Sequence, residues 1–389
     1  MGVLLEEGFR YSNQHVVFRT IRESGMITRR QLMQQTELSF QTVSNIVAEL
    51  IDTELVMSDG LVNQNAGKRA ESLKVNPDGL FAIGVLLDRA RIEIALVDLL
   101  GTVRSFREFN FAPSHPDAIM ENISAVTQEM LHDFEIPEER FAGIGLCTPG
   151  PIDFRSGALS RPPDFPHWTF VPIRPRLEEM TGYPVTLLKD SHAAALAELW
   201  TLQNSAPSSF FYLYFSTGIG GALVVNRNIW TGFSGNAGEV GHVRVSDSPV
   251  CDCGAVGCLE AVWSLNRLAR QTNQTVAGLV DSLETDHSPY RDQWMAGVPL
   301  LARVVVASVN IIEPEWVILG GPYGQRISAS LLTFLNEALQ REGFVRNLRP
   351  LTVRSATSRN AACLGAAMMR INDSLTHRTN VDSMVGLNI

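Results

Sequence analysis

A short segment in the second half of the chain gathers three cysteines and one histidine. Residues 235–261 read GNAGEVGHVRVSDSPVCDCGAVGCLEA, with His242 followed by Cys251, Cys253 and Cys258. Three thiolates and one imidazole complete the tetrahedral ligand set of a structural zinc ion, and four protein ligands leave no position for a reactive water. We therefore expect a metal that braces this loop and holds His242 close to Cys258. Ordinary reduced cysteines beside a loop histidine are the alternative, because a Cys-x-Cys pair alone does not exclude them.

Length and composition indicate a cytoplasmic protein of several domains. The chain has 389 residues, of which 45% are hydrophobic and 19% charged, so two or three packed units are expected. The first residues lack the pattern of a secretory signal, and no run reaches the roughly 18 apolar residues needed to span a bilayer. In a reducing compartment the clustered cysteines favour a metal over disulfides. Cys147 and Cys363 lie in apolar contexts and are interpreted as packing residues.

The acidic net charge limits how the chain could bind nucleic acid. The formal net charge is −9, which argues against non-specific binding by the whole surface. Residues 1–75 hold eight Lys and Arg against nine Asp and Glu, a net charge of −1, which leaves −8 for the remainder. DNA binding by this part would depend on local basic clusters such as Arg29-Arg30 and Lys68-Arg69.

The first 76 residues are predicted to form a winged helix-turn-helix domain. Residues 14–24 place their apolar side chains on one helix face and end at Gly25. Thr28 caps a second short helix, and the sequence TELS makes the turn before a third helix at residues 40–52. Three short helices in this order predict a helix-turn-helix.

The third helix has one apolar face and one polar, uncharged face. Gln and Asn side chains can read adenine edges bidentately, and Ser or Thr can bond bases or phosphates, so the polar face suits the major groove. A helix amino terminus near phosphate adds a favourable dipole. The predicted DNA contacts of the domain are Arg29, Ser39, Gln41, Thr42, Ser44, Asn45, Lys68 and Arg69.

The segment after the third helix has the pattern of a wing. In residues 55–77, LVMSDGLVNQNAGKRAESLKVNP, two strand-like runs flank a stretch with Gly, Asn and the pair Lys68-Arg69. These cations could contact phosphate or a narrow minor groove. A three-helix protein-interaction module is the alternative, and the wing favours DNA binding.

From residue 80 onward the chain alternates strands and helices. Strand-like runs such as FAIGVLLD, RIEIALVDLLG and FAGIGLCTPG come first, and PVTLLKD, FFYLYFSTGIGGALVVN and PEWVILGG follow. Helical patterns at 116–134, 191–203 and 298–313 separate them. This order predicts an α/β body. We expect lobes at residues 77–200 and 201–389, with the zinc loop in the second lobe and the carboxyl-terminal helix returning to the first.

The motif GEVGH followed by Cys-x-Cys-Gly-x-x-Gly-Cys-Leu-Glu, downstream of a helix-turn-helix, resembles the ROK family of repressors, open reading frames and sugar kinases. Supporting segments are GIGLCTPGPID at 143–153, PPDFPHW at 162–168, KDSHAAALAE at 189–198, STGIGG at 216–221 and ILGGP at 318–322. The resemblance covers nearly the whole chain. It favours the N-acetylglucosamine-repressor branch, which carries the amino-terminal head, over the kinases, which lack it. It implies an actin-like (ribonuclease H-like) body whose two lobes close on a hexose.

The resemblance also implies a set of sugar-facing residues. It places Asp190, Glu239, His242 and Glu260 at sugar hydroxyls, with His242 also on zinc. Carboxylates accept hydrogen bonds from hydroxyls, and a metal fixes the ring of the histidine that binds it. Glu260 could instead cap a helix, and Glu239 could pair with a surface arginine.

A phosphate-binding turn of the family is replaced in this chain. The turn Asp-x-Gly-Gly-Thr falls on Leu86, Leu87, Asp88, Arg89 and Ala90. Asp88 and Arg89 then place side chains where a bare backbone must approach phosphate. Leu86 replaces the carboxylate that would bind magnesium.

Loss of this turn argues against use of ATP. In the family's kinases the residue matching Asp190 is the general base, and here we expect it to be vestigial. The STGIGG segment is retained, but a glycine-rich turn by itself is weak evidence because it could be a tight hairpin. We therefore expect no ATP and no enzyme activity, since one turn alone cannot position a triphosphate.

Two departures from the family pattern bear on the ligand. Lys189 replaces an Asn before the family's catalytic Asp, and Asp164 replaces a second Asn, both of which contact sugar in the family. Lysine in the cleft suits a carboxylate or phosphate, which favours a sugar acid or sugar phosphate. A salt bridge from Lys189 to Asp190 or Asp164 is the alternative.

Together these features predict a transcriptional regulator, a repressor of carbohydrate genes, that binds a double-stranded DNA operator and senses a sugar. A homodimer or homotetramer would place two heads on a palindromic operator, and lobe closure would change their spacing. The alternatives are a sugar kinase with an unusual phosphate turn and a regulator whose body binds a sugar-transport protein.

Overall fold

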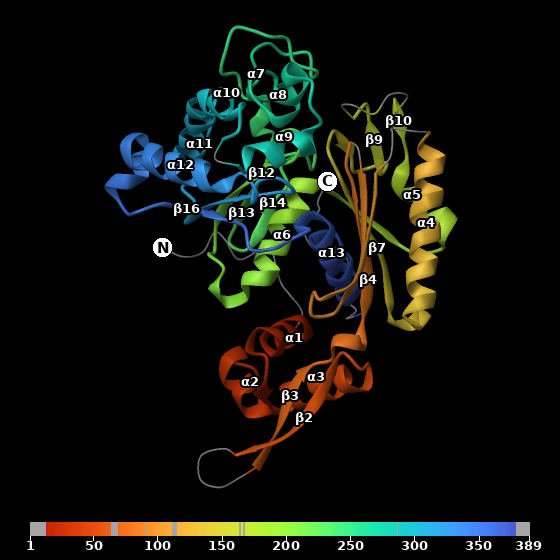
Figure 1. Ribbon diagram of the computed structural model, residues 1–389. Helices are drawn as coiled ribbons and strands as arrows, with labels where there is room; N and C mark the ends of the chain where they lie inside the picture. Colours follow the sequence, from red (N-terminus) through yellow and green to blue (C-terminus); the bar gives the residue numbers. More distant parts are fainter. Residues whose placement is uncertain are drawn as a thin grey trace.

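The computed structural model shows a small head attached to a body of two lobes (Figure 1). The structure describes residues 13–63, 69–89, 91–110, 115–162, 165, 168–285 and 287–378. Three residues named above, Lys68, Ala90 and Asp164, lie outside these ranges. Two five-stranded sheets in the body and a winged three-helix head confirm the predicted fold class.

The head is a three-helix unit with a three-stranded sheet of order β1-β3-β2. Thr28 caps α2 as predicted, because its hydroxyl accepts from the Gln31 backbone N–H while the Gln31 side chain accepts from the Thr28 N–H. The inner face of α3 buries Val43, Val47 and Leu50 in the head's core. The elements are α1 (Asn13–Ser24), β1 (Ile27–Thr28), α2 (Arg29–Thr36), α3 (Phe40–Asp52), β2 (Val56–Asn63) and β3 (Arg69–Val75).

The first lobe contains a sheet of order β11-β7-β4-β5-β6. β4 pairs antiparallel with β5 and parallel with β7, which pairs parallel with β11. The β4–β5 turn therefore lies at the same sheet edge as the ends of β7 and β11. Helices α4 and α5 cover the outer face (Figure 1). The elements are η1 (Pro77–Gly79), β4 (Phe81–Leu87), β5 (Arg91–Asp98), β6 (Val103–Asn110), α4 (Pro116–Asp133), η2 (Glu138–Arg140), β7 (Phe141–Thr148), β8 (Ile152–Asp153), β9 (Ala158–Ser160), β10 (Phe170–Val171), α5 (Ile173–Thr181) and β11 (Val185–Lys189).

The second lobe contains a sheet of order β14-β13-β12-β15-β16. β12 pairs antiparallel with β13 and parallel with β15, so the β12–β13 turn lies at the same edge as the end of β15. The elements of this part of the chain are α6 (Asp190–Leu202), η3 (Gln203–Ser205), β12 (Phe210–Phe215), β13 (Ile219–Val225), β14 (Asn228–Trp230), η4 (Val240–His242), α7 (Leu259–Val262), α8 (Leu265–Thr272), α9 (Val276–Leu283), α10 (Arg291–Ala296), α11 (Val298–Ile312), β15 (Trp316–Gly320), α12 (Ser328–Glu342), η5 (Phe344–Asn347), β16 (Thr352–Ser355) and α13 (Ala361–Arg378).

Two helices join the lobes. α13 packs on β4 and β7 of the first sheet, and α6 packs on β12 and β13 of the second sheet and along α13. Two glycines permit the close approach of α13: a Cβ at Gly84 would lie 2.0 Å from the Cys363 carbonyl oxygen, and one at Gly145 would lie 1.9 Å from that of Ala366. The carboxyl-terminal helix therefore lies on the first lobe's sheet. The boundaries proposed at residues 76/77 and 200/201 stay predictions.

One helical stretch needs a correction to the expectation that nothing in the chain is long and apolar enough to cross a membrane. Arg291–Ile312 spans 22 residues and contains an 18-residue window with a mean hydropathy of 1.9, which meets those requirements by length and composition. Its side chains Leu301, Val305 and Val309 are nevertheless buried in the core of the second lobe. Burial in that core accounts for its apolar composition.

The head contacts the body through side chains of α1 and of the loop after α3. The Arg22 guanidinium lies 3.7 Å from the centre of the Trp200 ring, a cation–π arrangement. Burial lowers the pKa of Arg22 to about 10. Glu23 lies 3.7 Å from Arg227 of the second lobe. The described contacts therefore connect the head to both the end of α6 and the second sheet.

Candidate metal centre and inter-lobe site

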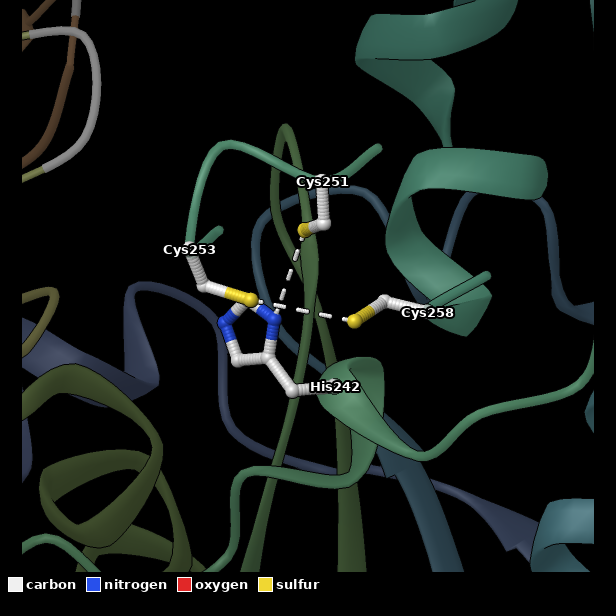
Figure 2. A group of neighbouring side chains, drawn as sticks. All are labelled: His242, Cys251, Cys253 and Cys258. Atoms are coloured by element: carbon white, nitrogen blue, oxygen red, sulfur yellow. Dashed lines mark hydrogen bonds between the residues drawn. The ribbon is translucent and has the colours of Figure 1, made fainter. Parts of the chain in front are cut away.

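The four predicted metal ligands converge on one point. Figure 2 shows His242 on a short helix, Cys251 and Cys253 on a loop, and Cys258 at the start of α7. Their ligand atoms all lie within 4.8 Å of one another. The Cys253 and Cys258 sulfurs are 3.7 Å apart, and His242 Nδ1 is 3.6 Å from the Cys251 sulfur. A tetrahedron with metal–sulfur bonds of about 2.3 Å has edges of about 3.8 Å, so the cluster fits a tetrahedral metal ion.

The backbone supports this geometry. Gly254 closes a turn by donating its N–H to the Cys251 carbonyl at 2.8 Å, and Cys251 donates its own N–H to Ala255 at 2.7 Å. Gly254 has a φ of +88°, which glycine adopts without strain. Burial raises the pKa of Cys251 to about 12. A bound cation would supply the charge that favours its thiolate.

The loop that carries the four predicted metal ligands also positions two of the three acidic residues that the resemblance placed at sugar hydroxyls. Glu239 lies three residues before the ligand His242, and Glu260 lies two residues after the ligand Cys258, in the first turn of α7. His242 Nε2 is 3.7 Å from Glu239 Oε2, so the ring has one nitrogen at the cysteines and the other toward a carboxylate. This is the usual arrangement around metal-bound imidazole.

Lys189 forms a salt bridge, as the alternative stated, but with a different partner. Its ammonium lies 2.5 Å from Glu239 Oε1 and also donates to the Ala237 carbonyl at 3.3 Å. Its side chain is only 3% exposed. Lys189 belongs to the first lobe and Glu239 to the second, so this pair crosses between the lobes. Sequence spacing pointed to the neighbouring Asp190 because it could not show that Glu239 folds back to this point.

Asp190 is buried at the start of α6. Burial raises its pKa to about 6, and the nearby Lys189 ammonium opposes that rise. Its Oδ1 accepts a hydrogen bond from the Ser191 N–H at 2.7 Å. Within the described part of the chain, the hydroxyls of Ser191 and of Thr148, which pairs with Lys189 in the sheet, are buried without a hydrogen-bond partner. Such hydroxyls normally find a partner, so this point suits a polar ligand.

Arg89 reaches from the replaced phosphate turn into the second lobe. Its Nη1 donates to the Thr217 hydroxyl at 2.8 Å, and its Nη2 lies 3.4 Å from Glu260 Oε1. The other oxygen of Glu260 accepts from the Ile219 N–H at 2.8 Å. Glu260 does lie in the first turn of a helix, as the alternative stated, but its carboxylate contacts the β12–β13 turn and Arg89.

A cavity of about 500 Å³ also lies between the lobes. Its lining includes Leu86, where the resemblance expected a carboxylate, and Glu93, whose pKa burial raises to about 7. None of the described sugar-facing candidates lines it. The cavity therefore borders the β4–β5 turn, and the acidic cluster lies outside it.

The predicted DNA contacts divide into exposed and engaged side chains. Gln41 and Asn45 are exposed on α3, where Gln41 donates to Asn45 at 2.9 Å. Ser39, the N-cap of α3, is exposed, and Arg69 is exposed at the start of β3. Thr42 and Ser44 are half-buried, and Arg29 forms an ion pair with Glu71. Lys68 lies outside the described residues.

Residues 82–372 match the ROK family. The chain belongs to the ROK family. A xylose repressor of Caldicellulosiruptor bescii is 26% identical over 387 residues, which cover 94% of this chain and 96% of that protein. A glucokinase of Thermotoga maritima is 32% identical over 231 residues, which cover 53% of this chain and 72% of that protein.

A solved structure supports the architecture of this ROK protein. The ROK family transcriptional regulator described as a homolog of the E. coli Mlc protein superposes with a TM-score of 0.78, covering 94% of this chain and 97% of that one. Its sequence is 22% identical, so the likeness establishes the fold, head and body together. The relatives of this family therefore include both repressors and kinases.

Sequence reasoning did not find the contacts that cross between the lobes. Arg89 was recognised as an obstacle to phosphate but not as a partner of Thr217 and Glu260. Asn236 also escaped notice, although its side-chain amide exchanges two hydrogen bonds with the Ile152 backbone, at 2.8 and 2.9 Å. The only available signal was their position in motifs next to turns.

Proposed function

We propose that this ROK protein is a sugar-responsive, DNA-binding transcriptional repressor of carbohydrate genes that does not phosphorylate its ligand. The observation that carries the proposal is a winged helix-turn-helix joined to a ROK body in which Asp88 and Arg89 stand in the first phosphate turn. Relatives named xylose repressor and matching over nearly their whole length support it. A cytoplasmic homodimer or homotetramer, which two-fold operators require, is part of the proposal.

The head's ligand would be a double-stranded operator. Sequencing of DNA fragments bound by the purified protein would identify it, and failure to enrich any fragment would contradict the proposal. With an operator in hand, Gln41→Ala or Asn45→Ala should weaken binding about tenfold, because each could lose a base contact. Arg69→Ala should weaken specific and non-specific DNA alike. The exposed Arg341, in the second lobe, gives the matched control Arg341→Ala, which should leave affinity unchanged.

We propose zinc as the structural cofactor. Three thiolates and one imidazole form a donor set that suits zinc, and the distances between them fit its tetrahedral geometry. Elemental analysis of the purified protein should give one zinc per chain. The metal would hold Glu239 and Glu260 in place, since each lies within three residues of a metal ligand.

The effector would be a sugar held by Asp190, Glu239, His242 and Glu260. Because Glu239 already neutralises Lys189, we favour a neutral sugar over the sugar acid or sugar phosphate that an unpaired lysine would suit. D-xylose is the first to test, since full-length relatives are named for it. Isothermal titration with neutral sugars, sugar acids and sugar phosphates decides among them, and binding of charged sugars alone would reverse this preference.

A kinase is the second candidate, because the Thermotoga maritima glucokinase shares 32% identity with part of the chain. A base with a pKa of about 6, as Asp190 has, could accept a hydroxyl proton. The replaced turn opposes this reading, since it offers side chains where phosphates need bare backbone. A coupled ATP-consumption assay with the sugar panel separates the two, and turnover that disappears in Asp190→Asn would establish the kinase.

A further inference from the structure

The side chain of Arg89 bridges the two turns that face each other across the lobes. It stands in the β4–β5 turn of the first lobe, and its partners Thr217 and Glu260 belong to the second lobe. One guanidinium nitrogen donates a hydrogen bond to the Thr217 hydroxyl, and another donates to the Glu260 carboxylate. A planar guanidinium holds its donors in a fixed fork, so this contact constrains both the distance and the orientation of the two turns.

The carboxylate of Glu260 is seated on the second turn. Its Oε2 accepts from the Ile219 N–H at 2.8 Å, and a Cβ at Gly218 would lie 2.2 Å from the same oxygen. Only glycine at position 218 leaves room for the carboxylate there. The Glu260 carboxylate thus lies against the backbone of the glycine-rich turn, and the Arg89 guanidinium balances its charge.

The bridge is shielded from solvent. The side chains of Arg89 and Glu260 are 12% and 21% exposed. Charge-assisted contacts are stronger when partly withdrawn from water, and losing one partner leaves the other poorly solvated. The pair therefore contributes more than a surface ion pair would.

We propose that Arg89 is a positioning residue that replaces a nucleotide as the link between the two turns. It holds the lobes at their present approach and fixes Glu260 where a ligand hydroxyl can reach it. The cleft is then ordered without ATP. The sugar-binding part of this inference rests on the proposed function, whereas the link between the turns does not.

The direct test is hydrogen exchange of residues 216–221 in the full chain without added sugar. Arg89→Ala should accelerate exchange at Ile219 about tenfold, because the Glu260 carboxylate that accepts from this N–H loses its cation. Thr217→Val should give a smaller increase. Arg104→Ala is the matched control, since Arg104 pairs with Asp98 and Asp78 inside the first lobe. Unchanged exchange in Arg89→Ala would overturn the proposal.

Ligand binding gives a second readout. Titration with D-xylose, or with whichever sugar of the panel binds, should show affinity reduced about tenfold in Arg89→Ala and partly restored in Arg89→Lys, because lysine can pair with Glu260 but lacks the fork. Tighter binding by Arg89→Ala would mean that Arg89 competes for Glu260, and would overturn the positioning role. If no sugar binds while exchange still rises, the proposed function fails and the link stands.

Discussion

The acidic residues Glu239 and Glu260 are held in two different ways. On one side, His242 and three cysteines bring short loop segments together, and Glu239 and Glu260 extend from those segments. On the other side, Arg89 reaches from the first lobe to Thr217 and Glu260 of the second, and Lys189 reaches Glu239. The first device lies wholly within the second lobe, whereas the second joins the lobes. One support thus lies within a single lobe, and the other depends on how the two lobes approach each other.

The difference also indicates which of the two supports should contribute more. Structural zinc contributes roughly 10–16 kcal/mol of apparent binding energy in small peptides, far more than a single charge-assisted contact of about 1.5–3 kcal/mol. The predicted metal should thus determine the positions of the Glu239 and Glu260 carboxylates, and the weaker contacts of Arg89 should determine how the lobes move. The following predictions test this ranking, from the largest effect to the smallest.

Loss of the metal should have the largest effect. Cys253→Ser should abolish stoichiometric zinc, lower the melting temperature by several degrees and eliminate sugar binding, because both carboxylates lose their support. Elemental analysis, calorimetry and sugar titration measure these changes. Asp252→Asn, an exposed residue between two ligands, is the control and should behave as wild type. A Cys253→Ser protein with unaltered sugar affinity would show that Glu239 and Glu260 do not need the metal to hold them in place.

Loss of a cross-lobe acid should have an intermediate effect. Glu239→Gln leaves the buried Lys189 ammonium with the Ala237 carbonyl and no carboxylate, so the free energy of unfolding should fall by about 1–3 kcal/mol. Urea denaturation measures this change. Adding Lys189→Met should recover most of the loss, because it removes the uncompensated charge. If the double variant is no more stable than Glu239→Gln, the pair does not account for the loss.

The last stability prediction concerns the protonation of Asp190, whose effect should be no larger than that of Glu239→Gln. Its pKa is raised to about 6, so the native protein binds this proton more tightly than the unfolded chain does. The stabilisation is complete below about pH 4 and is lost as the pH rises through about 6. Relative to Asp190→Asn, the wild type should therefore gain about 1–3 kcal/mol of unfolding free energy between pH 7 and pH 4. Denaturation across this range measures the gain.

Ligand affinity should change in the opposite direction. A protonated Asp190 accepts hydroxyl hydrogen bonds less well, so sugar affinity should fall as the pH drops through about 6. Glu93, whose pKa is raised to about 7, titrates in the same range, and Glu93→Gln separates its contribution. An Asp190→Asn protein that keeps the full pH dependence would exclude Asp190 as its source.

Local patterns predicted many of the elements and the convergence of His242 with three cysteines. The bounds of α3 follow from its 3.6-residue periodicity and a Ser cap, and the His/Cys cluster follows from residue type and spacing within one loop. These features depend on neighbours in the sequence. The cap at Thr28 belongs to the same class, since its box closes within four residues.

Contacts between the lobes were beyond such reasoning. Arg89 and Glu260 are separated by 171 positions, and Lys189 and Glu239 by 50. The pairing of Arg89 and Lys189 with particular carboxylates depends on how the two sheets and their edge turns are arranged. The sequence offers several acidic residues as partners for each cation. The sequence raised a salt bridge of Lys189 only as an alternative, with Asp190 or Asp164, and tertiary structure gave it Glu239 as its partner.

Helix α6 has a consequence for how the protein would respond to a ligand. It begins at the buried Asp190 and carries Trp200, on which Arg22 of the head rests, ten residues later. At about 1.5 Å of rise per residue, the two points are roughly 15 Å apart along one rigid rod. A tilt of α6 imposed at Asp190 would therefore be transmitted along the helix to the contact between Trp200 and Arg22. Helix α6 is therefore a rigid connection between Asp190 in the body and the head.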